Sequence, residues 1–162
     1  MEQATIGVIG AGQMGGGIAQ VLAQRGYAVR LLDVNEAAME RGLSAISTSL
    51  DRLIKKGTLA AEDKANVLGR ITPVLDIAEF RTAQIVVEAA TERKDLKFEV
   101  FRTLDALCSP ETILASNTSS ISITEIAAQT RRPENVIGMH FFNPVPLMSL
   151  VEIVRGLLTS AT

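Results

Sequence analysis

The chain has 162 residues, 47% hydrophobic and 21% charged, and its 16 lysine and arginine residues against 18 aspartate and glutamate residues give a net charge of -2. This length suffices for one domain with a substantial core, and the charge balance is unlike the basic footprint of a nucleic-acid-binding protein. A single cysteine cannot form an internal disulfide, and the early apolar run at 4–9 is too short for a signal peptide or a membrane span. We therefore expect a cytoplasmic protein whose partners are neither nucleic acids nor membranes.

Apolar runs of strand length alternate along the chain with segments whose apolar residues recur every three or four positions, which is the spacing of a helix. Gly26 and Gly57 follow two of the helical segments, where glycine commonly ends a helix. The expected elements, in chain order, are strand 4–9, helix 14–24, strand 27–32, helix 35–56, helix 61–68, strand 71–75, strand 84–89, helix 96–107, strand 112–115, helix 122–129, strand 136–142 and strand 150–154.

This alternation predicts an α/β fold of the Rossmann type, a doubly wound and mainly parallel sheet with helices on both faces. A short loop with two prolines separates the last two strands, so we expect them to form an antiparallel pair at the C-terminal end.

A G-x-G-x-x-G string at 10–15 lies between an expected strand and an expected helix. In that context Gly10 allows the tight turn, Gly12 lets the backbone approach a pyrophosphate, and Gly15 lets the helix pack closely on the strand. Asp33 follows the second strand, where an acid would bind the ribose hydroxyls and repel a 2′-phosphate, which favours NAD over NADP. The candidate cofactor-binding residues here are Gly10, Gly12, Gln13, Met14, Gly15 and Asp33. The alternative is a glycine-rich turn with a surface aspartate.

In a doubly wound sheet a ligand lies at the carboxyl ends of the strands, and His140, the only histidine, lies at such an end. Oxidation of an alcohol by hydride transfer needs a base for the hydroxyl proton, which histidine can supply. Glu152 on the return strand would fix the imidazole tautomer if it lies opposite. The alternative is a core histidine bonded to backbone.

Two further strand ends carry polar side chains. The hydroxyl-rich segment 116–120 could reach a substrate oxygen or a nicotinamide amide, although a turn and a helix cap would also explain it. Glu92 and Lys97 flank the start of a helix, and a solvated helix face is the alternative explanation for that pair.

Taken together, the segments 10–19, 116–120, 140–148 and 151–156 resemble the L-3-hydroxyacyl-CoA dehydrogenases, and among them most closely the bacterial 3-hydroxybutyryl-CoA dehydrogenases. The resemblance covers essentially the whole chain, with the motifs in the family's order and spacing. It implies that His140 is the catalytic histidine, Glu152 its carboxylate partner and Ser119 a catalytic serine that bonds substrate close to the nicotinamide. Further positions that it implies for the cofactor are Asp33, Glu92, Lys97, Ser119 and Asn143. The positions that it implies for coenzyme A are Ser49, Lys56 and Ser119, and it implies no metal.

The implied activity is NAD-dependent hydride transfer between (S)-3-hydroxyacyl-CoA and 3-oxoacyl-CoA, with a short acyl chain such as 3-hydroxybutyryl, as in fatty acid metabolism and β-oxidation. The family continues into a helical domain that completes the acyl pocket and forms a homodimer. We therefore expect residues 1–162 to be the NAD-binding domain without that second domain. Two alternatives stay open: an NAD-binding module with little or no turnover in isolation, and a related sugar-acid dehydrogenase that does not use CoA. The positions that the resemblance implies for coenzyme A, Ser49 and Lys56, argue mildly against the sugar-acid dehydrogenase.

Overall fold

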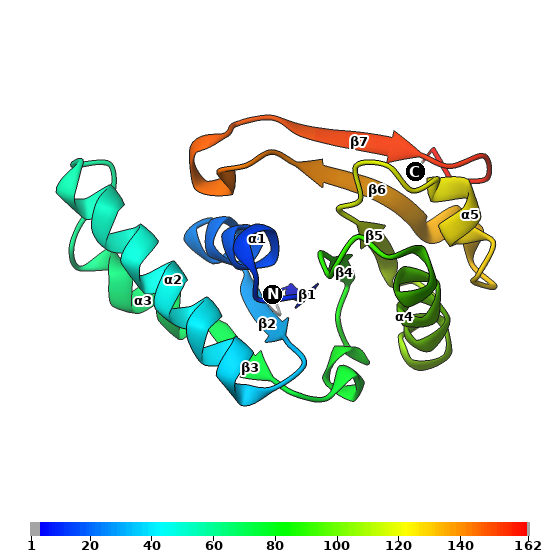
Figure 1. The fold of residues 1–162 in the computed structure, drawn as a ribbon, viewed down its shortest axis with the longest axis horizontal. Coiled ribbons are helices and arrows are strands. Elements are labelled where there is room, and N and C mark those ends of the chain that lie inside the picture. The colour runs from blue at the N-terminus through cyan, green and yellow to red at the C-terminus, as the bar shows by residue number, and fades with distance from the viewer. Residues whose placement is uncertain (1–3, 162) are drawn as a thin grey trace.

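Seven strands form one sheet in the computed structural model, which describes residues 4–161 (Figure 1). The strands are β1 (Thr5–Ile9), β2 (Ala28–Leu32), β3 (Ile71–Val74), β4 (Ile85–Glu88), β5 (Ile113–Ser116), β6 (Val136–Phe141) and β7 (Val151–Arg155). Their order across the sheet is β3-β2-β1-β4-β5-β6-β7, and all neighbours are parallel except β6 and β7. The mainly parallel sheet and its antiparallel C-terminal pair are confirmed.

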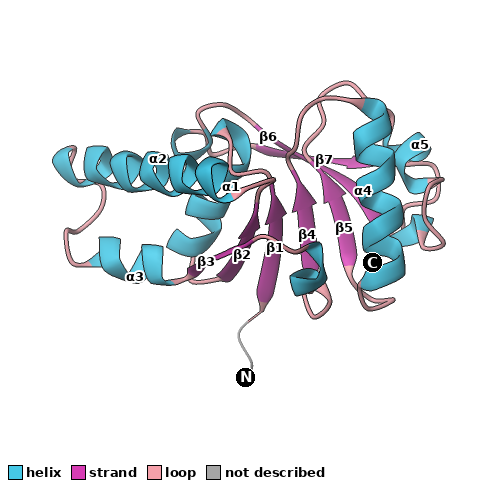
Figure 2. Cartoon of the chain, turned by 60° about the horizontal axis from the view of Figure 1, so that its bottom comes forward, coloured by secondary structure: helices cyan, strands magenta, loops and turns pink. Residues whose placement is uncertain are grey.

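The helices cover both faces of this sheet, as Figure 2 shows. They are α1 (Gln13–Gln24), α2 (Glu36–Lys55), α3 (Asp63–Gly69), α4 (Lys94–Leu107) and α5 (Ile123–Ala127), with short 3-10 turns at Ile77–Phe80, Pro133–Asn135 and Val145–Leu147. Val86 and Val87 are adjacent in β4, yet Val86 packs in the core cluster of α4 and α5 while Val87 packs in that of α1 and α2. Because successive strand residues point to opposite faces, a strand buried on both sides is continuously apolar.

The order of the strands reverses between β1 and β4, which lie side by side in the middle of the sheet. The loops that follow these two strands leave the same edge in opposite directions, one toward α1 and the other toward α4 (Figure 2). This is the switch point at which doubly wound folds bind their ligands.

Local signals in the sequence predicted several element boundaries. Gly26 and Gly57 end helical segments with positive φ of 93° and 73°. The Ser122 side chain accepts a hydrogen bond from the backbone N–H of Glu125, as in a capping box, but the Glu125 carboxylate binds Lys94 instead of reaching back. None of the described helices is long and apolar enough to cross a membrane.

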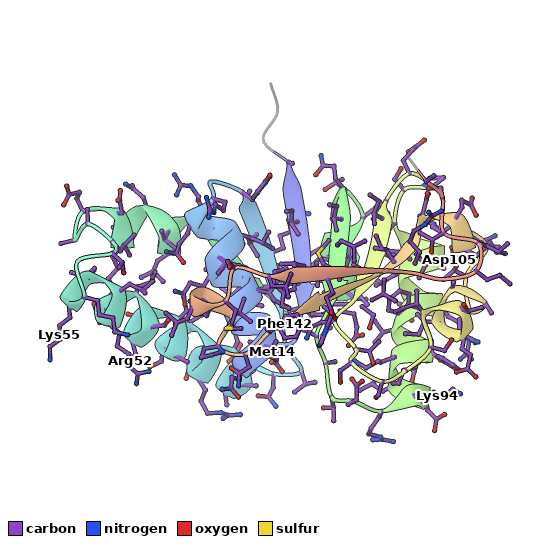
Figure 3. The ribbon with its side chains drawn as sticks, turned by 90° about the horizontal axis from the view of Figure 1, so that it is seen from above. Met14, Arg52, Lys55, Lys94, Asp105 and Phe142 are labelled. Carbon is purple, nitrogen blue, oxygen red and sulfur yellow. The ribbon has the colours of Figure 1, made fainter. Side chains whose placement is uncertain are left out.

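A buried ion pair joins the end of α4 to the segment before β6. Arg132 Nε lies 2.8 Å from Asp105 Oδ1, and the same guanidinium donates to the Cys108 carbonyl near the end of the helix. Burial raises the pKa of Asp105, but hydrogen bonds from Arg131 and Arg132 outweigh that effect and hold the pKa below its ordinary value of 3.8. Figure 3 shows Asp105 on the side of the molecule formed by α4 and α5, away from the switch point between β1 and β4.

Candidate active site

The glycine string forms the turn between β1 and α1 at the switch point. Gly10 has a φ of 97°, and a Cβ there would lie 2.7 Å from the Ala89 carbonyl oxygen. A Cβ on Gly15 would overlap the Gly10 carbonyl oxygen, so the loop can close on α1 only with glycine at both positions. Gly12 is the N-cap of α1, is exposed and has no side-chain cap. The N–H groups of the first turn of α1 are therefore available to a phosphate.

Asp33, directly after β2, is bound to this loop. Its Oδ2 accepts a hydrogen bond from the Ala11 N–H and its Oδ1 from the Val34 N–H, both at 2.6 Å. A carboxylate has about four acceptor sites, so each oxygen keeps capacity for a hydroxyl donor. The fold thus brings the predicted ribose acid next to the glycine string.

A hollow of about 570 Å³, the Asp33 hollow, opens beside these residues. Its lining is Ile9, Gly10, Gly12, Leu32, Asp33, Val34, Leu75, Asp76, Ile77, Ala89, Ala90, Thr91, Leu96 and Val100. Mostly apolar walls suit a flat purine ring, and the two carboxylates, with no cation among these lining residues, disfavour an extra phosphate. The glycine cradle, the uncapped helix and Asp33 together fit a dinucleotide with free ribose hydroxyls.

His140 and Glu152 lie directly opposite each other in the β6–β7 pair. His140 Nδ1 is 3.0 Å from Glu152 Oε2. Because a carboxylate only accepts, the neutral imidazole carries its proton on Nδ1 and leaves Nε2 as the basic nitrogen. The Phe142 ring packs against the imidazole with centroids 4.7 Å apart. The structure therefore places a carboxylate, rather than only backbone, beside this histidine.

A second hollow, the His140 hollow, meets the Asp33 hollow at Ala89 and Ala90, which line both. Its lining is Met14, Ala89, Ala90, Glu92, Lys97, Asn117, Ser119, His140, Phe141, Phe142 and Asn143. Met14 from α1 and Phe142 after β6 lie together in Figure 3, although they are far apart in the sequence. A ligand longer than one hollow can thus extend from Asp33 to His140 across the switch point.

Lys97 lies beneath this site and not on a solvated helix face, because its side chain is 1% exposed. Its Nζ binds Glu88 Oε1 at 2.6 Å, the Ala90 carbonyl at 3.2 Å and Glu92 Oε2 at 3.2 Å. Glu88 is fully buried and also accepts hydrogen bonds from the Ala90 N–H and from Ser116 Oγ, each at 2.7 Å. The cation thus joins the end of β4 to the loop that separates the two hollows.

Glu92 is partly exposed at the rim of the His140 hollow. Burial raises the pKa of Glu92, but the hydrogen bond from Thr118 and the charge of Lys97 outweigh that effect and hold the pKa below its ordinary value of 4.5. The carboxylate is therefore ionised at neutral pH and can accept a hydrogen bond from a ligand.

Ser119 is exposed in the loop after β5 and lines two hollows, one with His140 and Asn143 and another with His140 and Glu152. Beside it, Asn117 Oδ1 accepts the Phe141 N–H at 2.8 Å and so ties the end of β6 to this loop. The predicted serine thus lies in the same hollow as the predicted base.

The three candidate CoA residues, Ser49, Lys56 and Ser119, do not line one common hollow. Ser49 lines a third hollow, between α1, α2 and the β6–β7 loop, which Gln13 and Asn143 also line. Lys56 follows the end of α2, about 10 Å farther along the axis. It is exposed and lines none of the described hollows, and the neighbouring Arg52 and Lys55 extend away from the sheet in Figure 3.

Sequence reasoning assigned no individual role to Glu88, Thr118 or Gly42, although Thr118 belongs to the hydroxyl-rich segment 116–120 that was expected to reach a ligand. A charged residue ending an apolar strand was the signal for Glu88, and a glycine inside an amphipathic helix was the signal for Gly42. A Cβ on Gly42 would lie 2.5 Å from the Ala11 carbonyl oxygen, so glycine lets α2 approach the glycine loop. The described residues hold no cluster of three or more His, Cys, Asp or Glu placed for a metal ion.

Comparison with known proteins gives concordant matches. The chain matches the family model of the 3-hydroxyacyl-CoA dehydrogenase, NAD binding domain, over residues 5–162. A probable 3-hydroxybutyryl-CoA dehydrogenase of Bacillus subtilis is 52% identical over 160 residues, which are 99% of this chain and 56% of that protein. A 3-hydroxyadipyl-CoA dehydrogenase of Escherichia coli is 47% identical over 97% of this chain and 33% of its own length. The solved (S)-3-hydroxybutyryl-CoA dehydrogenase of Ralstonia eutropha has a TM-score of 0.95 at 49% identity, covering 99% of this chain and 56% of that one.

Proposed function

This chain belongs to the family of 3-hydroxyacyl-CoA dehydrogenase NAD-binding domains, and from that premise we propose that it carries the cofactor site and the acid–base group of a dehydrogenase acting on (S)-3-hydroxyacyl-CoA. The reaction is hydride transfer between C3 of the thioester and NAD, with 3-oxoacyl-CoA as the oxidised product. A short acyl chain, 3-hydroxybutyryl, is favoured by the names of the relatives. The observation that carries the proposal is that His140, paired with Glu152, lines a hollow that meets the Asp33 hollow at Ala89 and Ala90.

For the cofactor, the glycine loop and the N-terminus of α1 hold the pyrophosphate, and Asp33 binds the adenosine ribose. Bound NAD supplies a hydride acceptor at its nicotinamide. Met14, Glu92 and Asn143 line the hollow in which the nicotinamide end would lie, and Gln13 lies beside the loop. Lys97 supports this end through Glu92 and Ala90.

For the chemistry, His140 Nε2 takes the proton of the substrate C3 hydroxyl as the carbonyl forms, and gives it back in the reverse direction. Glu152 keeps the Nδ1 proton in place and stabilises the imidazolium that results. Ser119 donates its hydroxyl hydrogen to the C3 oxygen, on which negative charge develops during reduction of the carbonyl. No other histidine in the chain can act as this base.

For the CoA part of the substrate, we assign contacts to Ser49 in the third hollow and to Lys56 at the exposed end of α2. A lysine ammonium group facing phosphate is a favourable ion pair. Such contacts favour the CoA thioester over the sugar-acid alternative.

The chain spans about a third to a half of the length of the relatives named above. We propose that residues 1–162 act as the NAD-binding domain of a longer arrangement, in which a helical domain completes the acyl pocket and forms a homodimer. The exposed apolar side chains on and around β7 fit this arrangement; they are Leu147, Met148, Leu150, Val151, Ile153, Val154, Leu157 and Leu158. Isolated, the chain would then bind cofactor with little turnover. The reducing cytoplasm suits its single cysteine.

The test uses the purified chain. NADH fluorescence or calorimetry should show binding in the micromolar range, whereas NADH oxidation with acetoacetyl-CoA should be slow and should become fast when the helical domain of a relative is appended. His140→Gln should bind NADH as the unaltered chain does, and it should abolish the turnover of the extended form. Failure of the chain to bind NADH, or persistence of turnover in His140→Gln, would contradict the proposal.

A further inference from the structure

Thr118 lies one residue before Ser119 in the loop after β5, and its side chain is buried. Its hydroxyl donates a hydrogen bond to Glu92 Oε1 and accepts the backbone N–H groups of Ser120 at 3.3 Å and Ile121 at 3.0 Å. One side chain therefore closes the turn around Ser119 and attaches that turn to the loop after β4.

Both neighbours of Ser119 bind the same oxygen. Ser120 Oγ donates to Glu92 Oε1 at 3.1 Å, and Thr118 donates to that atom from the other side of Ser119. Because the residues before and after Ser119 share one acceptor, the backbone of Ser119 has little freedom to move relative to Glu92.

Glu92 is itself held by the buried cation beneath it. Lys97 Nζ binds Glu92 Oε2 at 3.2 Å and Glu88 Oε1 at 2.6 Å, and both Lys97 and Glu88 are buried. Glu88 also accepts a hydrogen bond from Ser116 Oγ, and that hydroxyl in turn accepts the Thr118 N–H at 3.2 Å. The start and the middle of the Ser119 loop are thus both connected to one buried charged pair.

We propose that Thr118 is a positioning residue, which fixes the Ser119 hydroxyl in the His140 hollow by linking the Ser119 turn to Glu92. This inference rests on the proposed function, because it requires Ser119, one of the cofactor positions that the resemblance implies, to bind the nicotinamide end of the cofactor in that hollow. Side chains that hold a reacting group within a fraction of an ångström contribute to binding through preorganisation, without contacting the ligand.

The test compares the affinities of the chain for NADH and for ADP-ribose, which lacks the nicotinamide end. Thr118→Val should weaken NADH binding about fivefold, the equivalent of one net hydrogen bond, and should leave ADP-ribose binding within about twofold. Thr118→Ser keeps the hydroxyl and should restore NADH binding. The matched control is Thr112→Val, which removes a buried hydroxyl bound to the Ala83 carbonyl at 2.8 Å, at the other end of β5, and should change neither affinity.

A double-mutant cycle with Ser119→Ala tests whether Thr118 acts through Ser119. If it does, Ser119→Ala and Thr118→Val/Ser119→Ala bind NADH equally weakly. Independent, additive losses would overturn the inference, as would equal weakening of NADH and ADP-ribose, or an unchanged affinity in Ser119→Ala. If Thr118→Val does not fold, Ser120→Ala removes the second link to Glu92 and should weaken NADH binding about twofold, again only while Ser119 is present. Failure of the unaltered chain to bind NADH would overturn the proposed function and this inference together.

Discussion

Replacing Lys97 by methionine tests the buried charge network most directly. Methionine has a similar length without the charge, so the change leaves the buried Glu88 carboxylate with only the Ala90 N–H and the Ser116 hydroxyl as donors. Lys97 is 1% exposed and Glu88 0%, so the change leaves a buried carboxylate without its cation. Removing one partner of a buried ion pair costs about 3–5 kcal/mol of the free energy of unfolding.

That cost corresponds to a fall of about 6–20 °C in the thermal midpoint of a chain of this size. Removing both charges in Glu88→Gln/Lys97→Met should recover a large part of the loss, because no charge then remains buried without a partner. The single variants Glu88→Gln and Lys97→Met, compared with the double variant, give the coupling energy between the two side chains.

Lys94→Met is the matched control, because Lys94, labelled in Figure 3, lies on the same helix and binds Glu125 at 2.8 Å, yet both side chains are about half exposed. Lys94→Met should lower the free energy of unfolding by less than about 1 kcal/mol. Unfolding in urea, followed by circular dichroism, measures all the variants. A loss in Lys97→Met no larger than that of Lys94→Met, or strictly additive losses in the double variant, would refute this account of Lys97.

Three further predictions follow from single side chains. Asp33→Ala should weaken NADH binding and raise the NADPH-to-NADH affinity ratio, because it removes the ribose acceptor and a repelling charge. Fluorescence titration with both nucleotides measures this ratio, and an unchanged ratio would reject the assignment of Asp33 to the ribose. Gly42→Ala should push α2 away from the glycine loop and lower both the thermal midpoint and the affinity for NADH. Gly69→Ala is its control: the added Cβ would meet no atom within 4 Å, so this change should stabilise α3 by up to about 1 kcal/mol. The pKa of Asp105 in the folded state lies below its ordinary value of 3.8. The ionised carboxylate therefore stabilises the fold above about pH 3.8, and this contribution to the free energy of unfolding is lost as the pH falls through the folded-state pKa. Urea midpoints measured from pH 6 down to about pH 3 should therefore fall less for Asp105→Asn than for the unaltered chain; parallel curves would argue against this role.

Patterns close together in the sequence predicted most of the architecture. Helical periodicity and strand-length apolar runs placed the elements near their observed bounds, and the glycine string between a strand and a helix predicted the turn in which Gly10 has a φ of 97°. Whether Glu152 lies opposite His140 was left open, because residues 142–150 connect β6 to β7 and a connection of that length allows several strand registers; the observed register pairs the two residues.

The sequence by itself therefore determined the fold class and the cofactor loop, and it named His140 and Glu152 as candidates, whose contact only the strand register settled. Only the tertiary structure decided that Lys97 is buried under the site instead of solvated, that Glu88 and Thr118 hold the Ser119 loop, and that Lys56 lies outside the described hollows. The physical reason is that backbone conformation and periodicity are local properties of a few neighbouring residues. The burial of a charge depends instead on oxygens that distant strands and loops bring around it.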